Sequence, residues 1–108
     1  MCGIAGVFSR NKNNVFDDLT DMLSMMRHRG PEGFGISING QTKKHNDFRQ
    51  FNADKIPGST GIGHCLLSIT GHGLQPFDSA SKNFSLAHNG QIYNYKELKL
   101  ILEKKGHR

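Results

Sequence analysis

Hydrophobic residues between positions 15 and 26 fall at helical spacing. They recur every three or four residues and form one apolar face, which consists of Val15, Phe16, Leu19, Met22, Leu23 and Met26. We therefore predict a helix over residues 15–26. Asn13 or Asn14 is in position to cap its start, and Gly30-Pro31 follows its end.

Apolar runs elsewhere have the pattern of strands. Residues 2–8 are almost continuously apolar, which predicts a buried strand near the start of the chain. Apolar and small residues alternate over 34–38 up to Asn39-Gly40, the strongest short signal for a hairpin, so an antiparallel partner strand should follow. Two more strands are expected over 61–69 and 84–88.

A second helix is predicted over residues 94–105. Its flanks offer a capping box, a hydrophobic staple and a C-terminal stop, formed by Asn94 with Glu97, Tyr93 with Leu98, and Gly106. The resulting element order, β-α-β-β-β-β-α, favours an α+β fold in which largely antiparallel sheets are covered by helices. No linker or repeat divides the 108 residues, so one domain accounts for them all.

Composition supports a globular protein. The chain is 35% hydrophobic and 21% charged, values that exclude collagen-like and disordered classes. No apolar run approaches the roughly 18 residues of a membrane span, so we predict no membrane association and a cytoplasmic location. Two cysteines without C-x-x-C spacing suit that reducing compartment. The net charge of +5 is scattered, which favours a solvated surface over nucleic-acid binding.

Cys2 is the sharpest chemical feature of the sequence. Removal of Met1 would leave a residue that carries both a thiol and a free α-amino group. An α-amine has an ordinary pKa of about 7.7 to 8.0, so part of it is neutral at physiological pH and can accept the thiol proton. Two other interpretations stay open at this point. Cys2 is also compatible with a core residue of an apolar strand and with a lipidation site.

The segment around Asn89-Gly90 offers two uncharged hydrogen-bond donors, a side-chain amide and a backbone N–H. Such a pair is able to form an oxyanion hole for acyl transfer. Asn-Gly is also the commonest pair in a tight hairpin turn, so a purely structural role is the alternative.

Two more groups of residues are candidates for a site. The run from Arg27 to Gly33 is a basic helix end, which complements the helix dipole or contributes to a site. His64, His72 and His88, together with Cys65, have no known zinc spacing, so no metal is predicted.

Five segments together resemble the class II glutamine amidotransferase domain, and within it most closely the N-terminal part of glutamine-hydrolysing asparagine synthetases. Their joint occurrence, in the family's order, is far more specific than any one of them. The segments are residues 1–8, 27–32, 63–69, 75–76 and 88–95.

The resemblance implies an N-terminal-nucleophile hydrolase fold, a four-layer α/β/β/α sandwich. It also implies that Cys2 attacks the side-chain amide of L-glutamine, that Asn89 and Gly90 hold the oxyanion, and that a thioester is hydrolysed to glutamate. The same carry-over implies that further residues line the glutamine pocket or support the nucleophile. Leu67, Ile69 and Gln91 are the pocket residues, and Arg29 is the supporting one.

Two departures from the family pattern qualify this picture. Relatives commonly have an arginine for the substrate α-carboxylate where this sequence has Leu66. The chain also ends before the family's aspartate motif and further strands, so we expect residues 1–108 to be the N-terminal portion of an incomplete, truncated domain.

The resemblance also sets expectations for cofactors and partners. No cofactor is expected in this segment; ATP and Mg belong to a missing synthetase domain that would receive the ammonia for asparagine synthesis. A homodimer of the full-length protein stays open. The competing interpretation is a catalytically impaired remnant that acts as an interaction or regulatory module.

Overall fold

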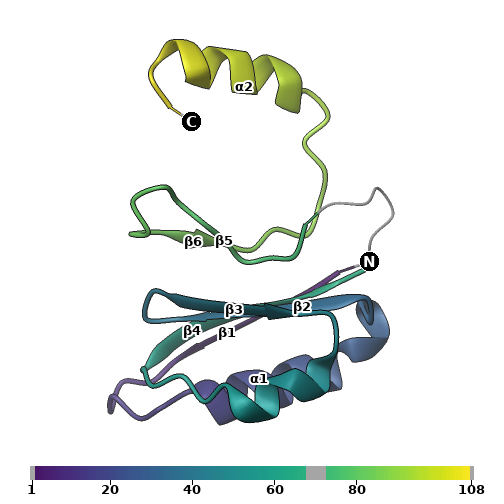
Figure 1. The fold of residues 1–108 in the computed structure, drawn as a ribbon, viewed down its shortest axis with the longest axis vertical. Helices are drawn as coiled ribbons and strands as arrows, with labels where there is room; N and C mark the ends of the chain where they lie inside the picture. The colour runs from purple at the N-terminus through teal and green to yellow at the C-terminus, as the bar shows by residue number, and fades with distance from the viewer. Residues whose placement is uncertain (1, 68–72, 108) are drawn as a thin grey trace.

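We describe residues 2–67 and 73–107 in a computed structural model of the chain (Figure 1). The elements are, in order, β1 (Gly3–Phe8), α1 (Phe16–Met25), the 3-10 helix η1 (Arg27–Arg29), β2 (Gly33–Ile38), β3 (Gln41–His45), the 3-10 helix η2 (Phe48–Ala53), β4 (Thr60–Leu66), β5 (Phe77–Asp78), β6 (Ser85–Leu86) and α2 (Tyr95–Lys104).

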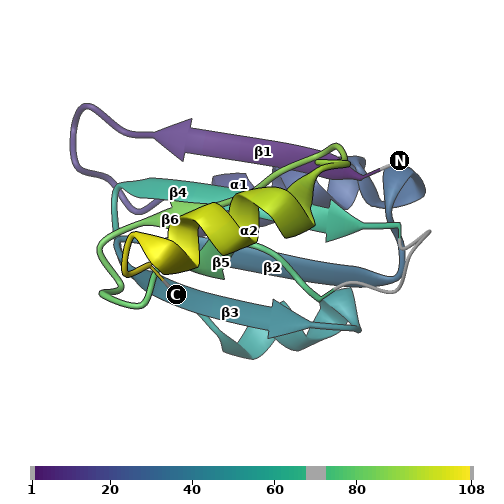
Figure 2. The ribbon, with the colours of Figure 1, turned by 90° about the horizontal axis from the view of Figure 1, so that it is seen from above.

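Four strands form one antiparallel sheet in the order β1-β4-β2-β3 (Figure 2). The central strand β4 pairs with β1 on one side and with β2 on the other, so that Cys65 lies opposite both Gly3 and Phe34. The start of β1 is therefore held next to the end of β4. This register brings the two ends of the first 67 residues together.

The elements stack in four layers, α1, the four-stranded sheet, the β5–β6 hairpin and α2 (Figure 1). This stacking agrees with the α/β/β/α sandwich that the family resemblance implies. Helix α2 stands away from the other layers, and none of its residues is buried. The radius of gyration, 14.7 Å, accordingly exceeds the about 13 Å expected for a compact chain of this length.

The hydrophobic core lies between α1 and the sheet. Leu19 and Leu23 of α1 are fully buried there, together with Ile36 and Ile38 of β2. Glycine on β4 lets the helix approach closely, because a Cβ at Gly63 would lie 2.9 Å from the Leu23 side chain. Gly61, Gly63 and Cys65 thus face α1, and the alternate β4 residues face the opposite layer.

Several local predictions are confirmed. The hairpin at Asn39-Gly40 joins β2 to β3, and both turn residues have positive φ values, 46° and 85°. Gly106 also has a positive φ, 87°, and follows the end of α2 as predicted. Helix α1 occupies Phe16–Met25 within the predicted range 15–26.

Other local predictions are wrong. Asn14 does not cap α1, because its side-chain oxygen accepts a hydrogen bond from Gly58 N instead. The box at Asn94 does not form, since its side chain makes no capping hydrogen bond, and Tyr93 is 91% exposed rather than packed in a staple.

The strand predictions differ from the structure mainly in length. The predicted strand 84–88 is confined to β6, Ser85–Leu86, and Asn89-Gly90 is not a hairpin turn because no strand follows it. Strand β4 ends at Leu66, and residues 68 and 69 of its predicted range lie outside the described part. Within 2–67 and 73–107, no helix is both long and apolar enough to cross a membrane.

Candidate active site

Cys2 lies immediately before β1, at the edge of the sheet where β1 begins and β4 ends. Its side chain is half-buried, and its Sγ donates a hydrogen bond to the Leu67 carbonyl oxygen over 3.8 Å. Leu67 directly follows β4, so the sheet register brings these two predicted site residues into contact.

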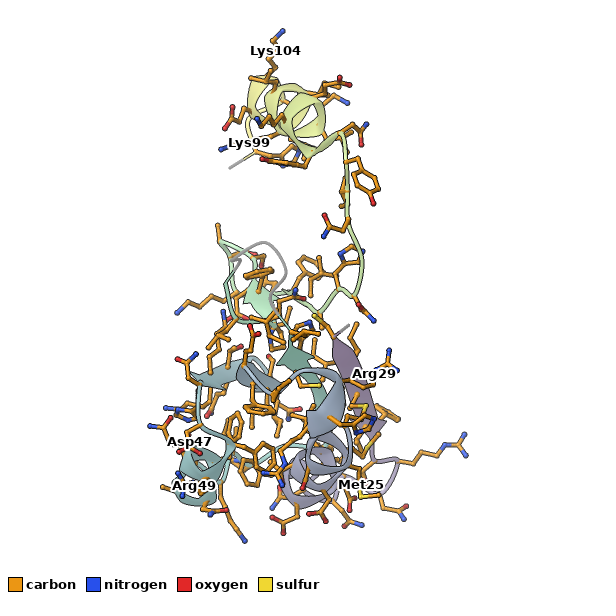
Figure 3. All side chains as sticks on the ribbon, turned by 90° about the vertical axis from the view of Figure 1, so that its right-hand side faces the viewer. Met25, Arg29, Asp47, Arg49, Lys99 and Lys104 are labelled. Carbon is orange, nitrogen blue, oxygen red and sulfur yellow. The ribbon has the colours of Figure 1, made fainter. Side chains whose placement is uncertain are left out.

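One amide donor and one guanidinium donor converge on the backbone carbonyl oxygen of Cys2. Asn89 Nδ2 donates to the Cys2 carbonyl oxygen over 3.1 Å, and Arg29 Nε donates to the same oxygen over 3.3 Å. Figure 3 shows Arg29 beside the start of β1. Residues separated by 27 and 87 positions in the sequence therefore meet at the predicted nucleophile.

Gly90 follows Asn89 on the exposed side of the same segment. A Cβ at this position would lie 3.0 Å from the His88 imidazole, so glycine leaves room beside that ring. Gln91 is exposed, and its side chain makes no hydrogen bond to another described residue. The predicted pocket residue Ile69 lies outside the described residues.

Leu66, which stands where the family arginine is expected, has apolar surroundings. It is 9% exposed and pairs with Gly33 of β2. A Cβ at Gly33 would lie 2.0 Å from the Leu74 side chain and 3.8 Å from Leu66 Cβ, so both leucines lie on the face of the sheet to which that Cβ would point. The structure puts hydrocarbon, not a cation, at this position.

His64 is a buried residue close to the site that sequence reasoning considered only as a metal ligand. It is fully buried, and neither ring nitrogen has a hydrogen-bond partner among the described residues. Burial lowers the pKa of the ring, and the His88 backbone partly offsets that effect. An unpaired buried polar group costs about 1 to 3 kcal/mol, so its presence here calls for an explanation.

Gln75 is a second residue whose role at the site the sequence did not predict. Its side-chain Oε1 accepts a hydrogen bond from His88 N over 2.6 Å. The only sequence signal was its place in a Gln-Pro pair within the family resemblance. Gln75 therefore holds the segment that carries Asn89.

The other cysteine, Cys65, has a different environment. It is fully buried, and its Sγ donates to the Met26 carbonyl oxygen over 3.4 Å. Burial raises the pKa of this thiol, so the thiolate form that acts as a nucleophile is disfavoured. Cys65 belongs to the core beneath the site rather than to the site itself.

No group of three or more His, Cys, Asp or Glu in residues 2–67 and 73–107 is arranged to hold a metal ion. Of the histidines considered in the sequence, His64 is buried and His88 is exposed, and His72 lies outside the described residues.

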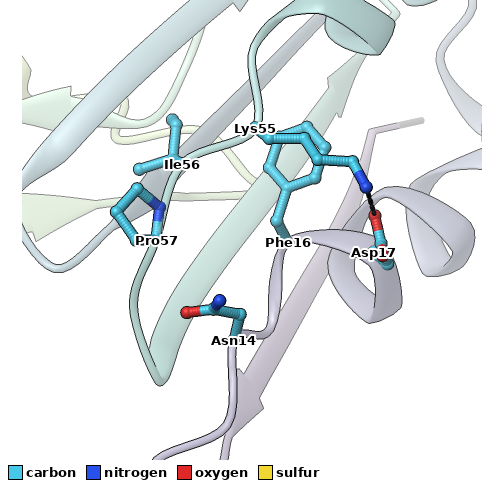
Figure 4. A pocket seen from close by; sticks show the side chains of 6 residues that line it. All are labelled: Asn14, Phe16, Asp17, Lys55, Ile56 and Pro57. Atoms are coloured by element: carbon cyan, nitrogen blue, oxygen red, sulfur yellow. Dashed lines mark ion pairs between the residues drawn. The ribbon is translucent and has the colours of Figure 1, made fainter.

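A surface hollow of about 200 Å³ lies at the other end of the sheet, where α1 begins (Figure 4). Asp17 and Lys55 form an ion pair across it over 3.8 Å, with both side chains 74% exposed. Its other lining residues are Asn14, Phe16, Ile56 and Pro57. An exposed ion pair of this kind contributes little to stability, and neither a thiol nor a hydroxyl group lines the hollow.

The chain is similar to known glutamine-using proteins. Residues 46–108 match the family described as glutamine amidotransferase domain. An amidophosphoribosyltransferase of Methanocaldococcus jannaschii is 35% identical over 99% of the chain and 26% of its own length. A putative glutamine-hydrolysing asparagine synthetase of the same organism is 29% identical over 96% of the chain and 20% of its own length.

Two further comparisons agree. A glutamine–fructose-6-phosphate aminotransferase of Bradyrhizobium diazoefficiens is 30% identical over 98% of the chain and 19% of its own length. The solved structure of the B. subtilis glutamine phosphoribosylpyrophosphate amidotransferase, complexed with ADP and GMP, covers 100% of the chain at 29% identity with a TM-score of 0.71. The chain covers 26% of that structure.

Proposed function

The chain belongs to the class II family of glutamine amidotransferase domains, and on that premise we propose that it hydrolyses L-glutamine to glutamate and ammonia with Cys2 as the nucleophile. The observation that carries the proposal is the meeting of Asn89, Arg29 and Leu67 at Cys2. Each comes from a different part of the chain, and each lies where the family resemblance predicts a site residue.

The first half of the reaction forms a thioester. With Met1 removed, the neutral α-amine of Cys2 takes the thiol proton, and the sulfur attacks the carboxamide carbon of glutamine. The C–N bond then breaks, and the nitrogen leaves as ammonia after receiving the proton from the α-ammonium group. The glutamyl group stays on sulfur.

Asn89 is suited to stabilise the oxyanion of the tetrahedral intermediate. Its amide nitrogen carries two hydrogens, and one of them donates to the Cys2 carbonyl oxygen. The second hydrogen and the backbone N–H of Gly90 are the two donors that we assign to the oxyanion. Removal of one such donor typically lowers the rate about a hundredfold to a thousandfold.

The second half of the reaction regenerates the enzyme. The α-amine, neutral again after release of ammonia, accepts a proton from water, and the resulting hydroxide attacks the thioester carbon. The C–S bond breaks, the sulfur regains its proton, and glutamate leaves. Arg29 supports both halves by holding the backbone of the nucleophile through its Nε.

We propose that ammonia passes to an acceptor-using domain outside these 108 residues, because the chain spans only 26% and 20% of the two M. jannaschii relatives. The sequence resemblance favours asparagine synthesis as the acceptor reaction. A phosphoribosyl acceptor is the second candidate, favoured by the higher identity of the amidophosphoribosyltransferase, 35% against 29%.

Leu66 is the observation that favours the second functional interpretation, a catalytically impaired remnant that acts as an interaction or regulatory module. Without an arginine clamp the substrate α-carboxylate loses hydrogen bonds worth about 1.5 to 3 kcal/mol each, so glutamine should bind more weakly than in relatives with the clamp. That observation concerns affinity and leaves the thiol chemistry of Cys2 unchanged.

Glutaminase activity of the full-length protein, measured as glutamate release, tests the proposal. We expect Cys2→Ala to abolish the activity and Cys65→Ala, the matched control, to retain it. Calorimetric titration with glutamine separates the alternatives further, since a regulatory remnant would neither bind nor hydrolyse it. Unchanged activity in Cys2→Ala would show that the mechanism is wrong.

A further inference from the structure

The segment that carries Asn89 and Gly90 has little secondary structure to hold it. Residues 87–90 lie between the two-residue strand β6 and helix α2, and they form neither a strand nor a helix. Asn89 and Gly90 themselves are exposed. A segment with so few buried contacts needs other anchors if its donors are to stay aligned with a reacting carbonyl.

One anchor is visible on the N–H side of His88. Gln75 Oε1 accepts from this N–H over 2.6 Å. Gln75 is itself fixed against the four-stranded sheet, because its carbonyl oxygen lies only 1.7 Å from where a Cβ on Gly35 would be. Gly35 thus permits this close approach, and a larger residue there would push Gln75 away.

The second anchor lies beneath the same segment. His64 is the cross-strand partner of Gly35, so both residues face the layer that Gln75 covers. Its imidazole is fully buried, and neither ring nitrogen has a partner among the described residues. His64 therefore lies on the face of the sheet that Gln75 covers, and Gln75 in turn binds the His88 N–H.

We propose that Gln75 and His64 hold the His88 backbone from two sides and thereby position the oxyanion donors that follow it. Gln75 accepts from the N–H, and we assign a ring nitrogen of His64, unpaired in the structure, as the donor to the carbonyl oxygen. Both are positioning residues, because neither touches the nucleophile or the substrate. The inference rests on the proposed glutamine hydrolysis and adds to it the device that aligns its donors.

This assignment explains two otherwise unconnected features. Gln75 lies 8 residues after Leu67 and 14 residues before Asn89 in the sequence, yet its side chain reaches the segment that carries Asn89. A buried histidine without a partner is a cost to folding that a functional role would justify.

Backbone amide hydrogen exchange of the chain tests the anchors without any need for activity. In Gln75→Met, which keeps side-chain length and removes the acceptor, we expect the His88 amide to exchange about tenfold faster. Gln75→Glu restores an acceptor and should restore slow exchange. Ile62→Val, on the same face of β4 as His64, is the matched control and should leave His88 unchanged.

The kinetic test uses glutamate release by the full-length protein. His64→Leu and Gln75→Met should each lower kcat about tenfold, a smaller loss than removal of an oxyanion donor itself. His64→Gln retains a neutral donor and should recover most of the rate. His64→Leu should unfold at the same denaturant concentration as the wild type or a higher one, because it replaces an unpaired polar group with an apolar one.

Two results would overturn the inference. One is unchanged His88 exchange in both Gln75→Met and His64→Leu. The other is faster exchange with no change in kcat. Failure of the proposed function would look different, because hydrolysis would then persist in Cys2→Ala. The hydrogen-exchange rates of the His88 amide would still test the two anchors in that case.

Discussion

Residues 2–67 and residues 73–107 are built in different ways, and the candidate site lies where they meet. The first region packs α1 against a four-stranded sheet and contains the hydrophobic core. In the second region, Pro76 is the one buried residue among those described. The proposed nucleophile Cys2 therefore belongs to a densely packed region, and the proposed oxyanion donors belong to a region that polar contacts hold in place.

The comparison indicates that stability and the proposed catalysis should depend on different residues. Core packing fixes Cys2 through the register of β1 against β4. By contrast, two single hydrogen bonds fix Asn89. Its Nδ2 donates to the Cys2 carbonyl oxygen, and the neighbouring His88 N–H donates to Gln75 Oε1. A change in the first region should unfold the protein, whereas a change in the second should lower activity in a folded protein.

The largest expected difference comes from matched core and surface truncations. Leu23→Ala removes a fully buried side chain of α1 and should lower the free energy of unfolding by about 2 to 5 kcal/mol. Ile101→Ala on α2, where the side chain is 50% exposed, should lower it by about 0.5 kcal/mol or less. Denaturant unfolding measures both, and equal effects would contradict the contrast between the regions.

Asn89→Ala should separate activity from stability most clearly. We expect kcat for glutamine hydrolysis to fall about a hundredfold to a thousandfold, because one oxyanion donor is lost. The unfolding midpoint should stay the same, since Asn89 is exposed. Asn83→Ala, also exposed and between β5 and β6, is the control and should leave kcat unchanged.

Leu66→Arg should strengthen substrate binding in a region that otherwise governs stability. The new guanidinium would supply hydrogen bonds to the glutamine α-carboxylate, each worth about 1.5 to 3 kcal/mol. We therefore expect KM for glutamine to fall about tenfold or more, with a smaller change in kcat. Leu66→Met, which adds no charge, should leave KM unchanged; the same KM in both variants would refute the missing-clamp interpretation.

The smallest expected effect is a pH dependence of stability that originates at His64. Its pKa is about 6.5 in the unfolded chain, and burial lowers it in the folded protein. Between these two values only the unfolded chain binds the proton, so the free energy of unfolding should decrease as pH falls from 6.5 through the folded pKa. Denaturation at pH 7.5 and pH 5 should show a smaller decrease in His64→Leu than in the wild type.

Local sequence patterns predicted the first region well. The Asn39-Gly40 hairpin and helix α1 follow from turn chemistry and apolar spacing alone. The predictions that depended on polar side chains were less successful, because such side chains have several possible partners. Asn14 illustrates this, because its side-chain oxygen accepts a hydrogen bond from Gly58 N, 44 residues away, instead of capping the start of α1.

The family resemblance assigned distant residues to one site, which spacing alone does not do. Asn89 and Cys2 are 87 residues apart, and no local pattern links them, yet Asn89 Nδ2 donates to the Cys2 carbonyl oxygen. Gln75 was not predicted as a partner of His88 because their contact depends on how β5 and the segment before it lie over the sheet. Tertiary packing of this kind leaves no periodic signal in the sequence.

The most direct test of the central claim is the site of covalent labelling by an electrophilic glutamine analogue, located by mass spectrometry of the full-length protein. We predict that the label is on Cys2, in molecules that have lost Met1, and that excess glutamine prevents it. Cys65 should remain unlabelled in the folded protein because it is fully buried. Labelling of Cys65 to the same extent, or labelling of Cys2 with Met1 still attached, would contradict the account.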